Sequence, residues 1–538
     1  MRVRKHRGGE RPRGTIRCGG SRMSQRLAVL RSVTIVSVST YIEYVLGLVA
    51  SIWIARALGP ADFGRYAFTV WLCGWLIICS NHALTTSSTK FIAEALGSGS
   101  TDVAAHIAHR LSWLQHVSSF VVVGLFIAAT CIVRPTEWGP YLVPATAAIA
   151  VSVIAKASYA MLVAIEKGQE RFEPEAIATV LAGILGLVLI IAAASVRAEL
   201  LAFIAIFTVS CLTLNLVNRF AFRRYGRAFF AGPIPRDLLA RLNRHLRLTA
   251  VLVLLGSFRS RTIETVLLNA FATTTAVGYF SIAATLTNGA VQLFSVGLTT
   301  TLLPYMAKLF GQHGHEHAAR ALTEATRFYW AVGIAIAGLG LVTTPGIVTL
   351  MYGSRYVEAI PAIESTIVLS GLLLLGAGIS AYQTVVDRQD DRIRITVIAL
   401  CVNAVLGILL IPPLGLTGAV MTYVGTRTAE FGLAVVYLRR ATTTRFPAAA
   451  MLRLFGVGCV ATAIAWLVTS GLHDHRYAFV AGALVFVVLY VPMSVFTRYW
   501  TDDDFRLMRS ITGRLGAPGR FLMRTLEALR RTRSRLRP

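Results

Sequence analysis

Apolar runs of about twenty residues recur along the whole chain, and this recurrence limits the possible fold more than any other feature. A helix of about twenty apolar residues spans the hydrocarbon core of a bilayer. Fourteen such runs lie between residues 33 and 497 of the 538-residue chain, and 55% of its residues are hydrophobic. The sequence therefore predicts an all-α polytopic membrane protein with about fourteen transmembrane helices.

The positively charged residues are distributed unequally between the loops on the two sides of the membrane. If the N-terminus is cytoplasmic, the cytoplasmic segments hold 43 of the 53 Lys and Arg residues and the external loops hold five. Positive residues concentrate on the cytoplasmic side, so we expect both termini in the cytoplasm and the protein in the cytoplasmic (inner) membrane. The net charge of +27 then reflects topology and attraction to anionic lipids, and a nucleic-acid partner is not expected.

A weak internal repeat divides the fourteen runs into two sets of six and a final pair. A shift of 214 residues pairs Gly64 with Gly278 and Gly97 with Gly311, and after the fourth run the shift becomes 221. Six is an even number, so both repeats start on the same side of the membrane and are parallel. Parallel repeats predict two lobes around a pseudo-twofold axis along the membrane normal, with a substrate site between them.

The repeat and the charge pattern together predict six parts of the chain. They are a basic cytoplasmic tail (1–31), a first six-helix lobe (32–218), a basic cytoplasmic crossover (219–247), a second six-helix lobe (248–438), an extra helix pair (439–497) and a second basic cytoplasmic tail (498–538). The first tail is rich in Arg and Gly without helical periodicity, which predicts disorder. The second alternates Arg with Leu and Phe, which predicts an amphipathic helix on the inner leaflet.

Charged residues inside the apolar runs are the candidate functional residues, because a bare charge at the bilayer centre costs about 3 kcal/mol or more. The run Leu248–Ala272 carries Arg259, Arg261 and Glu264 near its centre. Arg261 and Glu264 are three residues apart and can partly neutralise each other. Arg259 has no acidic residue within one helical turn. We predict that Arg259 and Arg261 face a cavity and bind an anionic substrate.

Other charges lie in other apolar runs. Lys156, beside aromatic residues, is the next candidate for substrate binding. Glu43 and Glu264 are candidates for charge balance or ion coupling, and a structural salt bridge is an equally weighted alternative for Glu43. Arg427 and Glu430 are three residues apart, which predicts a structural pair that fixes helix packing.

The first external turn carries a recognisable pattern. The run ARALGP at residues 55–60, followed by FGRYA at residues 63–67, resembles the first hairpin of bacterial polysaccharide (O-antigen-type) flippases. These belong to the multidrug/oligosaccharidyl-lipid/polysaccharide exporter superfamily. The resemblance covers the first twelve predicted helices. It implies a flippase that moves polyprenyl-diphosphate-linked oligosaccharide from the inner to the outer leaflet by alternating access.

The same resemblance implies partners. They are an anionic lipid-linked oligosaccharide as substrate, membrane lipids, and polysaccharide polymerase or assembly proteins as candidate protein partners. The sequence contains no GxxxxGK[ST], GxSxG, HExxH or CxxC motif, and its external loops are short. We therefore expect a transporter and not an enzyme, with no catalytic residue, no metal site and no cofactor.

Two alternative functions stay open. A drug/cation antiporter of the same superfamily would carry mainly acidic charges inside the membrane, whereas the central runs of this chain are at least as basic as acidic. A non-transporting scaffold of a polysaccharide assembly complex would tolerate the loss of its intramembrane charges but would depend on its basic tails.

Reporter fusions test the predicted orientation. We expect fusions within residues 219–247, within 387–393 and after 498 to report the cytoplasm, because Lys and Arg concentrate in these segments. Fusions within 350–361 should report the external side. If the segment 350–361 reported only the cytoplasm, both the orientation and the parallel repeat would be wrong.

Overall fold

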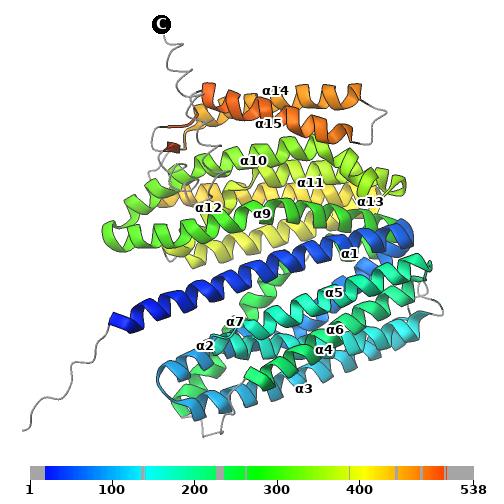
Figure 1. The fold of residues 1–538 in the computed structure, drawn as a ribbon, viewed down its shortest axis with the longest axis vertical. Coiled ribbons are helices and arrows are strands. Elements are labelled where there is room, and N and C mark those ends of the chain that lie inside the picture. The colour runs from blue at the N-terminus through cyan, green and yellow to red at the C-terminus, as the bar shows by residue number, and fades with distance from the viewer. Residues whose placement is uncertain are drawn as a thin grey trace, which may run out of the picture.

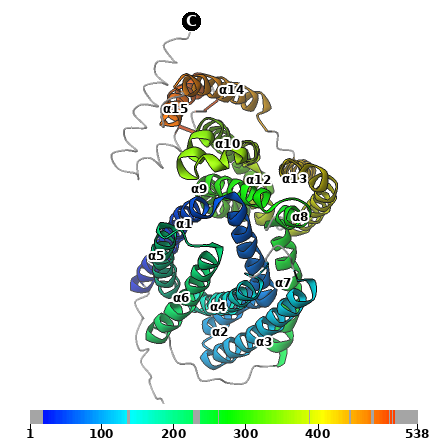
Figure 2. The same cartoon turned by 90° about the vertical axis from the view of Figure 1, so that its right-hand side faces the viewer.

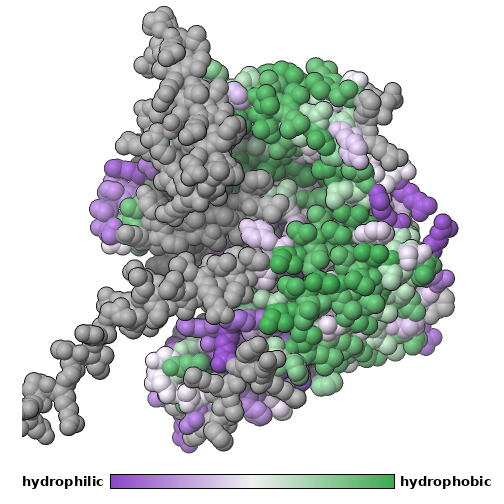
Figure 3. Space-filling model, viewed as in Figure 1, coloured by the Kyte–Doolittle hydropathy of each residue, from purple (hydrophilic) through white to green (hydrophobic). Residues whose placement is uncertain are grey.

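The protein is described by a computed structural model. It covers residues 19–505, with gaps at 135–138, 140, 226–235, 261–262, 387, 443–445, 473–476, 498 and 502–503. In these ranges every regular element is a helix, and the long helices lie roughly side by side (Figure 1). Figure 3 shows a broad hydrophobic surface over the centre and right of the molecule, bordered on the right by hydrophilic residues. The predicted all-α membrane class is therefore confirmed.

Several described helices are long and apolar enough to cross a membrane. There are nine of them in the described ranges, or ten if a pair bent by 43° counts as one span. Two are too long for one crossing, because Tyr41–Asn81 has 41 residues and Asp390–Arg440 has 51, against about twenty needed. Each contains a glycine with non-helical backbone, Gly59 (φ 75°) and Gly415 (φ 54°). The chain is thus a multi-pass membrane protein, and the count of fourteen stays a prediction.

The helices pack in three groups (Figures 1 and 2). The first group contains α1 (Gly19–Asn81), α2 (Leu84–Gly97), α3 (Thr101–Val133), α4 (Leu142–Gly168), α5 (Glu173–Ser195) and α6 (Leu200–Tyr225). From it, α7 (Arg236–Ser260) leads to α8 (Ile263–Phe271), α9 (Thr274–His313), α10 (His315–Met351), η2 (Ser354–Ala359), α11 (Ile360–Leu372), α12 (Leu375–Val385) and α13 (Gln389–Ala441). The last pair, α14 (Ala448–Gly471) and α15 (Ala478–Phe496), packs on α10. We call the first two groups the first and second lobe, and their predicted residue boundaries stay predictions.

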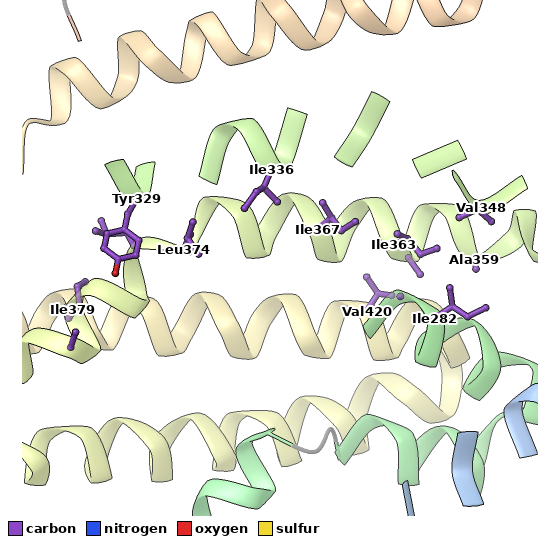
Figure 4. Packing of buried hydrophobic residues seen from close by; sticks show 14 of the residues in the cluster. Ile282, Tyr329, Ile336, Val348, Ala359, Ile363, Ile367, Leu374, Ile379 and Val420 are labelled. Atoms are coloured by element: carbon purple, nitrogen blue, oxygen red, sulfur yellow. The ribbon is translucent and has the colours of Figure 1, made fainter. Parts of the chain in front are cut away.

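A large buried apolar cluster holds the second lobe together, with members on α9, α10, α11, α12 and α13. Figure 4 shows Ile336 of α10 and Ile367 of α11 pointing toward one another in this cluster. Close backbone approach strengthens the packing, because a Cβ at Gly371 of α11 would lie 2.5 Å from the Gly333 carbonyl oxygen of α10. Small residues at helix interfaces allow such approach where lipid supplies no hydrophobic driving force.

One expected feature differs from the structure. The tail predicted to be disordered is partly helical, because α1 begins at Gly19. Residues 1–18 lie outside the described part. Met, Gln, Arg and Leu between residues 23 and 31 favour helix, and extension of an existing helix costs little. The second tail, predicted to be an amphipathic helix, lies outside the described residues from 506 onward.

The run Leu248–Ala272, predicted as one helix, is described as two. α7 ends at Ser260 and α8 begins at Ile263, with residues 261–262 outside the described part. Glu264 lies in the first turn of α8, where a negative charge is favoured by the helix dipole. Glu264 therefore suits the start of a helix as well as it suits the middle of a helix, where the sequence predicted it.

The two lobes meet where α1 packs against α9, and two glycines lie at the closest approach. A Cβ at Gly64 would overlap the carbonyl oxygen of Thr274, and a Cβ at Gly278 would lie 2.5 Å from the carbonyl oxygen of Pro60. The same Cβ at Gly278 would lie 3.2 Å from the Gly64 nitrogen, so the two glycines face each other. Gly64 and Gly278 are equivalent in the repeat. Equivalent residues touch each other only at the symmetry axis, which therefore passes between them.

Two more contacts follow the same repeat. Tyr44 of α1 lies against Gly289 of α9, and its hydroxyl donates to the Thr285 carbonyl oxygen at 3.1 Å. Trp75 of α1 lies against Phe258 of α7, with ring centroids 4.6 Å apart. Phe258 follows Tyr44 by 214 residues, and Gly289 follows Trp75 by 214. A twofold axis turns each of these contacts into the other, as parallel repeats require.

Alanine substitutions test the glycine contact. We expect Gly64→Ala and Gly278→Ala each to lower the free energy of unfolding by about 1–3 kcal/mol, because the added methyl meets backbone atoms that cannot rotate away. Chemical denaturation of the purified protein measures this change. Gly97→Ala and Gly311→Ala are matched controls, since this second repeat pair has nothing within 4 Å of the Cβ position. Equal effects for both pairs would contradict the close approach.

Candidate functional site

A cavity of about 550 Å³ lies inside the second lobe, between α9, α11, α12 and both halves of α13. Its polar lining includes Asn288, Gln383, Arg392, Tyr423, Arg427 and Glu430. Two arginines and one carboxylate thus line a cavity within a membrane-embedded helix bundle. Charges at membrane depth are tolerated where they face such a cavity, and they mark it as the candidate functional site.

The bend between α11 and α12 forms one wall of this cavity. The two helices meet at 43°, and Leu373 and Leu374 at the bend line the cavity. Turn hydrogen bonds satisfy the backbone there, from Leu374 N to Gly371 O at 3.1 Å and from Gly376 N to Leu373 O at 2.9 Å. Non-helical backbone at membrane depth is tolerated where it is satisfied or lines a cavity. The bend therefore opens space at little cost in backbone hydrogen bonding.

Arg427 is held in the cavity wall by two neighbours on its own helix. Its Nη1 lies 3.1 Å from Glu430 Oε2, and its guanidinium lies 5.4 Å from the centre of the Tyr423 ring. The Arg427 side chain remains 31% exposed. The structure places this pair, which the sequence assigned to helix packing, in the lining of the cavity.

Glu264 lies next to this pair in a smaller cavity of about 30 Å³, which also borders Arg427. The Glu264 residue is 2% exposed, and its Oε1 accepts a hydrogen bond from Asn403 Nδ2 at 2.8 Å. The Asn403 amide also donates to Thr426 Oγ1 at 3.2 Å. A space of this size holds about one water molecule or one small ion beside a buried carboxylate.

The structure separates the remaining predicted residues. Lys156 lies in the first lobe, where its Nζ is 5.8 Å from the centre of the Phe207 ring, and it is not among the residues lining the two cavities described above. Glu43 is exposed on α1 and acts electrostatically on Tyr159 of α4. Neither residue is brought together with Glu264. In the described ranges, no three His, Cys, Asp or Glu side chains group closely enough to hold a metal ion.

Arg259 and Arg261 are the leading candidates from the sequence. The side chain of Arg259 and the whole of Arg261 lie outside the described residues. Their neighbours in the chain, Phe258 and Ile263, both line the small cavity that contains Glu264. The segment that carries the two arginines therefore begins and ends at the candidate site.

Two cavity residues were missed by the sequence analysis. Arg392 was counted among the charges of a cytoplasmic loop, but it lies in α13 and its Nη1 donates to Thr384 Oγ1 at 3.0 Å in the cavity wall. Tyr423 lies one turn before Arg427. Residues four apart share a helix face, so this spacing was a usable signal.

The lobes contact each other at the end of the molecule where the Gly59 turn of α1 lies. The Tyr356 hydroxyl donates to the Ala55 carbonyl oxygen at 2.8 Å, and Tyr356 is fully buried. The Arg56 guanidinium donates to the Leu350 carbonyl oxygen. These contacts form a seam next to the Gly59 turn, which the charge pattern predicts to be external. Arg392, at the start of α13, lies toward the predicted cytoplasmic end of the cavity.

Comparison with known proteins gives the following. The family model "Polysaccharide biosynthesis protein" matches residues 29–310, and no curated protein matches the chain. The structure is similar to the lipid II flippase MurJ in an inward closed conformation, with TM-score 0.62, 13% identity, and coverage of 85% of this chain and 97% of that chain.

It is also similar to a multidrug resistance MATE family transporter of the MOP superfamily in two conformations. The inward-facing conformation has TM-score 0.59, 15% identity and coverage of 75% and 96%. The outward-facing one has TM-score 0.52, 15% identity and coverage of 77% and 95%. At these identities the likeness concerns the fold, and it confirms the predicted fold class.

A double-mutant cycle tests the contact between Glu264 and Asn403. We expect Asn403→Leu to lower the free energy of unfolding by about 1–3 kcal/mol, because the buried carboxylate loses a donor. In a Glu264→Leu background the same change should cost less, with a coupling of about 0.5–3 kcal/mol. Chemical denaturation measures the free energy of unfolding of the wild type, the two single variants and the double variant. Asn288→Leu, on the cavity wall away from Glu264, is the control, and zero coupling between Glu264 and Asn403 would contradict the contact.

Proposed function

The chain belongs to the polysaccharide biosynthesis protein family, and we propose that it is a flippase for polyprenyl-diphosphate-linked oligosaccharide. It is a membrane transporter of this family, as the resemblance of its first hairpin implied. In the proposal it moves the sugar head from the inner to the outer leaflet of the cytoplasmic membrane by alternating access, with both termini in the cytoplasm. Membrane lipids surround it, and polymerase or assembly proteins are its proposed protein partners.

The observation that carries the proposal is a cavity with two arginines in its wall inside a membrane protein of this family. A diphosphate that enters the membrane must give up its hydration. Arginine replaces the lost water with planar, permanently charged donors that match phosphate oxygens. Arg427 keeps part of its side chain exposed. It is therefore the described side chain best suited to contact the diphosphate.

The charges around the cavity explain why further cations are needed. Arg392 and Arg427 carry two positive charges, and Glu430 and the adjacent Glu264 carry two negative charges when ionised. Such a wall has no net charge with which to hold an anion. We propose that the α7–α8 segment supplies the excess through Arg259 and Arg261, with Lys156 as a further contact from the first lobe. Neutralisation of a carboxylate by a coupling ion would have the same effect.

Alternating access is supported by the seam between the lobes. Transport by this route requires the contact of α1 with α9 to open while the opposite end closes. Glu264 and Glu43 are the proposed sites of ion coupling, because intramembrane carboxylates change charge when they bind a proton or a cation.

A transport assay on reconstituted protein tests the role of Arg427. With a fluorescent polyprenyl-diphosphate oligosaccharide in proteoliposomes, we expect Arg427→Ala to weaken substrate affinity about ten- to a hundredfold, the cost of one charge-assisted contact. Arg427→Lys should retain part of the activity, because the charge stays while the planar fork is lost. Arg453→Ala, which removes an exposed arginine on α14, is the matched control and should transport normally.

Further variants separate binding from folding. Arg427→Ala combined with Glu430→Gln removes both charges of the pair, so a transport defect that persists in this folded double variant reflects substrate binding.

Arg259→Ala should abolish transport in a folded protein, and Arg259→Lys should keep part of it. If Arg259→Ala unfolds the protein and Glu43→Ala restores both stability and export, Arg259 is a structural lock. Normal transport by all charge variants would favour a scaffold, and transport of cationic drugs alone would favour an antiporter.

A further inference from the structure

A buried acid–amide pair lies in the first lobe, away from the cavity. Glu166, near the end of α4, and Asn218 of α6 are both 0% exposed. Asn218 Nδ2 donates to Glu166 Oε1 at 3.0 Å. The pair lies at the end of the lobe that the charge pattern predicts to be cytoplasmic. It takes no part in the proposed substrate site.

Each member of the pair has an acceptor left over. Glu166 Oε2 and Asn218 Oδ1 are buried and have no hydrogen-bond partner among the described residues. Ile165, next to Glu166 on α4, belongs to a buried apolar cluster that also contains Met161 of α4 and Phe91 and Ile92 of α2. Buried acceptors in such places are rare, because an unpaired polar group away from water is costly.

Nearby charges do not neutralise the carboxyl group. Lys167, next to it on α4, forms its own ion pair with Glu175 of α5 at 2.8 Å. Arg171 in the α4–α5 turn acts on Glu166 only at a distance, as do Lys167 and Glu175. The described side chains of α2, α3 and α6 bring no charged group into contact with it. Glu166 also lies at the C-terminal end of α4, where the helix dipole disfavours negative charge.

One proton satisfies both leftover acceptors. A proton on Glu166 Oε2 would make that oxygen a donor, and Asn218 Oδ1 belongs to the amide that already donates to Oε1. With Oδ1 as its acceptor, the two hydrogen bonds would close a cyclic acid–amide pair. If the Asn218 amide were turned the other way, its Oδ1 would lie against Glu166 Oε1. These two acceptors would then also require a proton between them. An isolated buried carboxylate typically neutralises in this way instead of remaining charged.

We propose that Glu166 and Asn218 form a proton-binding site in the first lobe, with the proton on Glu166 Oε2 donated to Asn218 Oδ1. The site holds its proton while this end of the lobe is dry and releases it when water reaches the pair. It gives the protein a pH-sensitive group far from the substrate cavity. The inference does not depend on which substrate is transported.

Infrared difference spectroscopy on the full-length protein in lipid nanodiscs tests the site. Between mildly acidic and alkaline pH, the wild-type protein should lose the carbonyl stretching band of a protonated carboxylic acid. Glu166→Gln should lack the part of this band that Glu166 contributes and should fold, because an amide in its place still accepts from Nδ2 and donates to Oδ1. Asn218→Ala should keep the band but move it to higher frequency, because the acid loses its acceptor.

Glu94→Gln is the matched control. Its hydrogen bond from Arg241, at 2.7 Å, holds the pKa of the exposed Glu94 carboxyl below its ordinary value, so this group stays ionised at both pH values. The control should therefore show the wild-type band. Identical spectra for wild type and Glu166→Gln, or a band unmoved by Asn218→Ala, would overturn the proposal. A band removed by adding Na⁺ or K⁺ at constant pH would also overturn it, in favour of a cation site.

Discussion

The close approach of α1 and α9 is the contact on which the arrangement of the two lobes depends. In a bilayer, backbone groups must be satisfied within each helix, so separate lobes are joined by side-chain packing or by direct approach of helix surfaces. Here Gly64 and Gly278 remove the side chains altogether, and backbone meets backbone. This contact lies beside the Gly59 turn, so it joins the lobes near one end of the repeat axis, which is the predicted external end. The buried hydroxyl of Tyr356, which donates to Ala55, adds a directional bond to the same seam.

The charges of the second lobe are arranged so that the empty cavity costs little. Arg427 is paired with Glu430, and Glu264 is covered by the amide of Asn403. Charges that are paired and hydrogen-bonded are tolerated inside a membrane, whereas unpaired ones are expensive. In the proposed function, an arriving diphosphate competes with Glu430 for the guanidinium of Arg427. Such competition allows binding without leaving a bare cation between transport cycles.

The lengths of the apolar runs were sufficient to predict the helical membrane fold, and the register of the repeat predicted that Gly64 and Gly278 are equivalent. Local pattern did not predict where helices begin. α1 starts at Gly19, because flanking polar residues with good helix propensity extend a helix that the membrane already stabilises. Charge in an apolar run is visible in the sequence, which therefore singled out Arg427 as part of a structural pair and Glu264 as a charge-balancing or ion-coupling residue. Arg392 was assigned to a loop because its exposure depends on the bend between α11 and α12, which is a property of packing.

The repeat preserves the scaffold but not the charges, and this difference bears on where an anionic head would bind. The position equivalent to Arg427 in the first lobe is Ile206, and the one equivalent to Glu264 is Ala50. Conversely, Lys156 corresponds to Ser370, which lines the cavity of the second lobe. If both lobes carried equal charges, they would hold an anionic substrate on the repeat axis. Its transfer toward either side of the membrane would then be opposed equally. Here the arginines are concentrated in one lobe, so the diphosphate of the proposed substrate would stay with that lobe as the other lobe moves. The movement would change the side of the membrane from which these arginines can be reached.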